Sequence, residues 1–95
     1  MEQNLKLAKN STFKIALNAL PTGSWRGDYN GSSYIVTKTL FSGGQSVKLV
    51  AEELSGNDYI SLNYYVLSSG KTLLKPCEMP SEKVVQFVLG IIPNQ

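Results

Sequence analysis

Apolar and polar residues alternate through the middle of the chain, and the alternation predicts an antiparallel sheet. The segments with this pattern are rich in β-branched and aromatic residues, which favour strands. Short turns of serine and glycine, such as Ser42-Gly43-Gly44, separate them. The predicted strands are 33–41 (SYIVTKTLF), 45–54 (QSVKLVAEEL), 59–67 (YISLNYYVL) and a shorter return strand over 71–75.

The N-terminal third gives a weaker pattern. Residues 1–11 are polar and are expected to be flexible. In 12–20 (TFKIALNAL), apolar residues alternate with Lys14 and Asn18, so this segment is predicted to be a further strand. Residues 21–33 contain one proline and three glycines and are predicted to be a loop.

The C-terminal segment has helical character. Ser81 is a good N-cap and Glu82 suits the positive end of the helix dipole, while Pro93 is expected to end the helix. The residues between are apolar around most of the circumference, whereas a surface helix needs only one apolar stripe. Either the helix lies deep against the sheet or a second subunit covers it, and we favour a homodimer through this helix.

These elements predict an α+β fold: an antiparallel four- to five-stranded meander sheet followed by one C-terminal helix packed on one face. Residues 12–95 are expected to form a single domain, consistent with a chain of 95 residues. The composition, 42% hydrophobic and 17% charged, is that of a globular protein. No apolar run approaches the roughly 18 residues needed to cross a bilayer, and no signal-peptide core is visible, so a cytoplasmic location without a membrane partner is expected.

Catalytic chemistry is poorly represented. The chain has no histidine and one cysteine, Cys77, which excludes Ser-His and Cys-His pairs and an ordinary zinc site. Glu52 and Glu53 are adjacent on a strand and point to opposite faces. Gly70-Lys71-Thr72 resembles the end of a phosphate-binding loop, but Tyr65 replaces the required first glycine and no helix follows. We therefore predict no enzyme activity, catalytic residue, metal or cofactor.

The strand 59–67 offers binding chemistry instead. One set of its side chains, beginning with Ile60 and Leu62, is expected to meet the helix. The other set, which includes Tyr59, Asn63 and Tyr65, then faces water. On neighbouring strands Lys38, Lys48 and Tyr34 are expected to share that wet face. Rings that stack bases beside ammonium groups that meet phosphates suit single-stranded nucleic acid, although tyrosines are also ordinary strand residues that stabilise a sheet.

The net charge of +2 permits a polyanionic partner without requiring one. The charge is uneven, because residues 1–50 carry six basic and two acidic groups while residues 51–95 carry three basic and five acidic groups.

The segment Ile60–Tyr65 (ISLNYY), followed by Gly70, by Leu74-Lys75-Pro76 and by a terminal helix, resembles the positive-cofactor and Whirly group of single-stranded-DNA-binding transcriptional regulators. The resemblance implies a β-β-β-β-α unit that dimerises through its helix and grips single strands with lysines and aromatic residues of the sheet. Tyr64 and Tyr65 match the aromatic pair of a hairpin strand in that group. Cys77–Pro80 stands where the group has a basic, glycine-containing strand.

Three functions are compatible with these observations. The first is binding of single-stranded nucleic acid, with a role in transcription regulation. The second is a protein-interaction or structural module of unknown partner with no nucleic-acid role. The third is a small-ligand binder that uses the Trp25 loop as a lid. The residues predicted to contact nucleic acid are Lys38, Lys48, Tyr59, Tyr65, Lys71 and Lys75, with Trp25 and Arg26 contributed by the loop.

Overall fold

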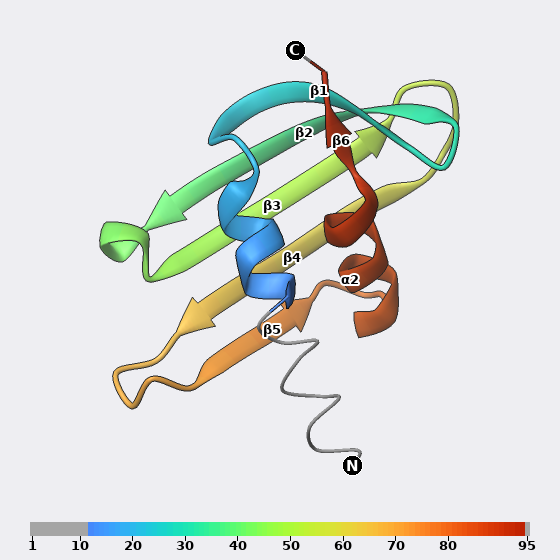
Figure 1. Ribbon diagram of the computed structural model, residues 1–95. Helices are drawn as coiled ribbons and strands as arrows, with labels where there is room; N and C mark the ends of the chain where they lie inside the picture. The colour runs from blue at the N-terminus through green and yellow to red at the C-terminus, as the bar shows by residue number, and fades with distance from the viewer. Residues whose placement is uncertain (1–11, 95) are drawn as a thin grey trace.

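A six-stranded antiparallel sheet forms the frame of the molecule, in the order β5-β4-β3-β2-β1-β6 (Figure 1). The computed structural model describes residues 12–94, so the predicted flexible segment 1–11 lies outside the described residues. The first five strands follow one another as a meander, and β6 returns to pair with β1. The strands are β1 (Gly23–Tyr29), β2 (Ser32–Phe41), β3 (Ser46–Glu53), β4 (Tyr59–Val66), β5 (Thr72–Pro76) and β6 (Ile92–Pro93).

The α+β class, the antiparallel meander and the C-terminal helix are confirmed, but the sheet gains a strand and a second helix is present. Helix α2 (Ser81–Gly90) and the N-terminal helix (residues 12–19) lie on the same face of the sheet (Figure 1). A short 3-10 turn, η1 (Ser42–Gly44), joins β2 to β3.

The prediction of a strand over residues 12–20 was wrong, because this segment is mainly helical. Phe13, Leu17 and Leu20 are buried, at the spacing of four and three residues that places side chains on one helix face. Ile15, which a strand would have placed beside Phe13 and Leu17, is 70% exposed. The apolar residues of this segment fit both the two-residue period of a strand and the period of a helix. The helix is the form that buries Phe13, Leu17 and Leu20 against the sheet.

The prediction of a loop over residues 21–33 was also wrong, since most of it is strand β1. Gly27 is buried where the C-terminal segment crosses the strand. A Cβ at this position would lie 3.0 Å from the Ile91 side chain and 3.0 Å from the Ile92 carbonyl oxygen. Gly27 was taken as a sign of a loop, but it lies within a strand at a point where another backbone segment approaches closely.

Both ends of α2 differ from the prediction. Pro80, not Ser81, occupies the N-cap position, and no side chain caps the first turn. The helix ends at Gly90, because Ile91 is already extended, and Pro93 belongs to β6. The last residues are thereby free to pair with β1 as an edge strand.

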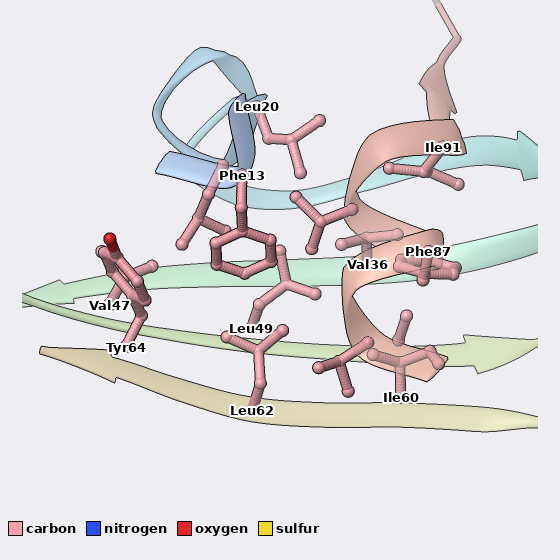
Figure 2. Close-up of a cluster of buried hydrophobic side chains, with 14 of the residues drawn as sticks. Phe13, Leu20, Val36, Val47, Leu49, Ile60, Leu62, Tyr64, Phe87 and Ile91 are labelled. Atoms are coloured by element: carbon pink, nitrogen blue, oxygen red, sulfur yellow. The ribbon is translucent and has the colours of Figure 1, made fainter. Parts of the chain in front are cut away.

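The core lies between the two helices and one face of the sheet (Figure 2). From α2 it receives Val84, Phe87 and Val88, and from β4 it receives Ile60 and Leu62, all with 2% exposure or less. The predicted orientation of β4 is thus confirmed. Most of the apolar residues of α2 are covered within one chain, and a homodimer through this helix stays a prediction. Within residues 12–94, no helix is long and apolar enough to span a membrane.

Candidate nucleic-acid interface

The face of the sheet opposite the two helices carries the candidate site, and we call it the outer face. No helix of the described residues covers it. Strand parity decides which side chains reach it, because successive residues of a strand point to opposite faces. On β3 and β4 the inward residues Val47, Leu49, Ile60 and Leu62 are buried, so the residues between them point outward.

The strand register brings two lysines together on the outer face. Lys48 of β3 pairs with Asn63 of β4, and Asn63 pairs with Lys75 of β5, so the three lie in one row across the sheet. Adjacent strands are about 4.8 Å apart, which places the two lysine backbones about 10 Å apart. Within the described residues, neither ammonium group makes an ion pair, since the pair between Lys83 and Asp58 involves other groups. Both lysine side chains are exposed.

The next row along the strands supplies aromatic surface. Tyr65 pairs with Ser46 on one side and with Leu73 on the other, and Ser46 pairs with Phe41. Phe41 is 49% exposed. Together the two rows define what we call the basic–aromatic half of the outer face. Its residues are Thr39, Phe41, Ser46, Lys48, Asn63, Tyr65, Leu73 and Lys75, and none of them is acidic.

The other half of the outer face has a different character. Tyr59 pairs with Glu52, Glu52 with Ile35, and Ile35 with Arg26. The carboxylate of Glu52 therefore stands between the predicted contacts Tyr59 and Arg26. Asp28 lies one row further and accepts a hydrogen bond of 2.9 Å from the Ser33 hydroxyl. This half thus carries two carboxylates, Glu52 and Asp28, beside the one guanidinium of Arg26, whereas the basic–aromatic half carries no carboxylate.

The placement of Lys38 on the wet face was wrong, as was that of Tyr34. Both lie on the helix-covered face, because Lys38 pairs with Leu49 and Tyr34 neighbours Val36 at the same parity. Lys38 is only 4% exposed. Its ammonium group donates to the carbonyl oxygens of Leu17 at 2.8 Å and Leu20 at 2.7 Å, and burial lowers its pKa. Lys38 thus holds the N-terminal helix and cannot reach a ligand on the outer face.

Trp25 is not on a loop, and its predicted role there is corrected. It lies on β1 opposite Val36 and packs against the core from the helix-covered face. Its indole nitrogen donates to the Pro21 carbonyl oxygen at 2.7 Å. The idea of a Trp25 loop acting as a lid therefore loses its structural basis. Lys71, in contrast, is exposed in the turn between β4 and β5, beside the basic–aromatic half.

A second polar cluster ties α2 to the sheet. Asp58 accepts hydrogen bonds from the Tyr34 hydroxyl at 2.8 Å and from the Lys83 ammonium at 2.6 Å. The hydrogen bond from Lys83, more than that from Tyr34, holds the pKa of Asp58 below its ordinary value. Burial, together with the adjacent Asp58 carboxylate, raises the pKa of Tyr34. The polar groups of this cluster hydrogen-bond to one another, so we interpret the cluster as the attachment of α2 to the sheet.

Phe41 and Asn63 belong to the basic–aromatic half but were not among the predicted site residues. Asn63 was already expected on the wet face of its strand, and its row became visible only with the register. Phe41 points to the same face as Ile35, Thr37 and Thr39. If Tyr34 had been predicted to point inward, Phe41 would have been predicted on the outer face. The sequence alone gave no reason to prefer that parity, since both faces of β2 carry β-branched residues.

Among residues 12–94, no group of three or more His, Cys, Asp or Glu side chains is placed to hold a metal ion. Comparisons with protein-family models, with curated proteins and with solved structures found no match to this chain.

Proposed function

We propose that the protein binds single-stranded nucleic acid on the basic–aromatic half of its outer face. One observation carries the proposal. Two lysines, Lys48 and Lys75, lie on the same open surface as the rings of Tyr65 and Phe41. That surface contains no acidic residue. Lysines meet phosphates and rings stack on unpaired bases. A duplex hides its base faces, so the arrangement favours a single strand.

The geometry favours a short contact with little sequence preference. Across β2 to β5 the row from Phe41 to Leu73 spans three strand spacings, or about 14 Å. Two rings within that span suit a few nucleotides, and stacking on a ring accepts any base. The Asn63 amide lies between the two lysines and offers a hydrogen-bonding group to a base or phosphate, and its nitrogen also donates to the Cys77 Sγ at 3.9 Å. A role in transcription regulation and a cytoplasmic setting are part of the proposal, and the transcriptional role rests on the resemblance alone.

A titration of a fluorescent oligothymidine by anisotropy at low and moderate salt tests this proposal. Three lysines at the site, with Lys71 as the third, predict that log K falls with log salt with a slope of about −2, because each phosphate contact on a single strand contributes about −0.7. Replacing Tyr65 by alanine is expected to cost about 1–3 kcal/mol of binding free energy, the value of one stacked base.

Matched variants separate this face from general basicity. Lys48→Gln and Lys75→Gln should each weaken binding, whereas Lys14→Gln removes the same charge from the N-terminal helix on the opposite face and should not. Tyr59→Ala, beside Glu52, should weaken binding less than Tyr65→Ala. Equal effects of Lys14→Gln and Lys48→Gln, or no binding at low salt, would overturn the proposal.

The alternative function is a protein-interaction or structural module. The outer face also carries apolar side chains that a protein partner would cover. Ile35 is 38% exposed and Leu73 is 40% exposed. Val50 is half-buried between them on β3. Absence of nucleic-acid binding would leave this reading in place, because the same face would then be available to a protein surface.

A further inference from the structure

A pocket of about 240 Å³ opens on the helix-covered side of the molecule, away from the proposed nucleic-acid interface. It lies between the N-terminal helix, the η1 turn and the inner face of β3 and β4. Its lining residues are Lys14, Asn18, Gly43, Gly44, Gln45, Val47, Tyr64 and Val66. No prediction from the sequence concerned this pocket.

The size of the pocket limits its ligand. Drug-sized ligands occupy pockets of about 300–1,000 Å³, whereas a cavity of about 150 Å³ can hold benzene. The observed volume therefore suits a single ring or short chain with one polar substituent. The strand residues in the lining, Val47, Val66 and the ring of Tyr64, supply its apolar surface. That ring is fixed by a tilted contact with Phe13 at 5.4 Å between centroids, and Figure 2 shows Tyr64 beside Val47.

Four polar side chains that line the pocket have no partner among the described residues. Lys14 is the charged residue of the lining, and the lining contains no acid. The side chains of Lys14, Asn18 and Gln45 make no hydrogen bond or ion pair with another described residue. The Tyr64 hydroxyl likewise has no partner among residues 12–94, although only 4% of Tyr64 is exposed. These groups can donate to a ligand without breaking an existing interaction.

The η1 turn keeps one wall of the pocket free of side chains. Gly43 and Gly44 have φ values of 67° and 94°, in the left-handed region that favours glycine. A Cβ added at either position would meet nothing within 4 Å. The glycines are thus required by the backbone path and not by crowding, and they leave backbone amide surface open at the rim.

We propose that this pocket binds a small organic carboxylate, with the carboxylate at Lys14 and the apolar body on Val47, Val66 and the Tyr64 ring. One ammonium group supported by neutral donors matches a singly charged carboxylate, whereas a phosphate dianion is generally met by more than one cation or by an arginine fork. The proposal does not depend on nucleic-acid binding, because the residues that carry it lie on the opposite face of the sheet.

The test is an NMR titration of the full chain with benzoate, phenylacetate and hexanoate, each compared with its primary amide. Small fragments of this kind bind with Kd values of about 1 mM. We expect at least one carboxylate to cause saturable shifts of the Gly43, Gly44 and Gln45 amides and to bind more tightly than its amide. No saturable shift at these amides with any of the three carboxylates at about 10 mM would overturn the proposal.

Two variants test the assigned groups. Lys14→Gln should weaken carboxylate binding about two- to fivefold and abolish the preference over the amide. Tyr64→Phe removes only a hydroxyl without a protein partner, so it should weaken carboxylate binding while the protein remains folded. Lys48→Gln on the outer face is the control and should change neither. Equal affinity for carboxylates and amides, or no effect of Lys14→Gln, would overturn the proposal even if the outer face binds nucleic acid.

Discussion

Lys38 is a charged side chain placed inside the molecule, and its position explains how the N-terminal helix is held. The last carbonyl groups of a helix have no intrahelical donor. Lys38 donates to those of Leu17, Asn18 and Leu20, at distances of 2.7–3.3 Å. A cation at this end is also favoured by the helix dipole. The benefit offsets the cost of burying an ammonium group that has no carboxylate partner within the described residues.

We expect Lys38→Met to destabilise the protein by about 1–3 kcal/mol. Methionine keeps the apolar stem but removes the donor of the buried Leu20 carbonyl oxygen, whereas the Leu17 carbonyl oxygen still accepts from the Leu20 amide. One buried acceptor left without a donor costs about that amount. Urea unfolding followed by the fluorescence of Trp25, the sole tryptophan, measures the change. Lys48→Met, on the exposed outer face, is the control and should stay within about 0.5 kcal/mol of the original protein. A stability of Lys38→Met equal to that of this control would contradict the anchoring role.

The orientation of individual side chains shows which parts of the candidate site could be predicted from the sequence. On β4 the alternation of large apolar residues with polar ones fixed the parity, so Tyr59, Asn63 and Tyr65 were correctly placed outward. On β2 both faces carry β-branched residues, so the pattern did not show which face is buried. Lys38 was therefore predicted on the outer face, where the structure places Phe41 instead. A shift of one residue moves every side chain to the other face. The long stem of lysine also hides its burial from a pattern of hydrophobicity.

At the scale of elements, the largest errors fell on segments whose structure depends on distant partners. The central strands 33–41, 45–54 and 59–67 were predicted within two residues of their observed ends, because each has its own pattern. Residues 12–20 suit both a strand and a helix, and packing on the sheet decides between them. Strand β1 contains Gly27, which the sequence pattern takes for a loop residue. The reason for this glycine is the close approach of Ile91 and Ile92, more than 60 residues later.

Helix α2 is fixed to the sheet at its first turn by Lys83, and Asp58→Asn tests that attachment. The side chains of Asp58 and Lys83 are 34% and 41% exposed, so solvent screening limits the ion pair to about 1 kcal/mol or less. Because the folded pKa of Asp58 is lowered, its contribution is fully present above the unfolded pKa of about 3.9. It is lost as the pH falls through the lower folded pKa.

The stability difference between the original protein and Asp58→Asn should therefore be constant from about pH 7 to pH 5 and disappear near pH 2. Urea unfolding at several pH values measures it. Asp28→Asn makes the same acid-to-amide change on the outer face, away from the first turn of α2, and serves as the control. A difference that is as large at pH 2 as at pH 7 would mean that Asp58 does not act through its charge.

At the scale of the whole molecule, both helices lie on one face of the sheet and leave the other open. The covered face supplies stability and contains the pocket, while the open face carries exposed lysines and aromatic rings. A one-sided sheet of this kind can devote a full face to binding, because its core is complete without it. A homodimer through α2 would use the outward side of that helix and would leave both faces of the sheet unchanged.

The side of α2 that remains apolar is formed by Val85 and Leu89, which are four residues apart and share a helix face. Val85 is half-buried and Leu89 is 42% exposed. Standard stable interfaces bury about 800 Å² on each partner, more than two side chains supply, so any dimer through this stripe is expected to be weak and dependent on concentration. Sedimentation velocity over a range of concentrations should then show a rising weight-average mass.

Leu89→Lys should return the protein to the monomer, because an ammonium group in the stripe would have to lose its water on association. Gln86→Lys adds the same charge at an exposed neighbour outside the stripe and should leave the equilibrium unchanged. If the original protein sediments as a single species of 10.4 kDa at every concentration, the dimer prediction is wrong. Contacts within one chain would then be the complete explanation for the apolar character of α2, since its inward residues Val84, Phe87 and Val88 are already buried.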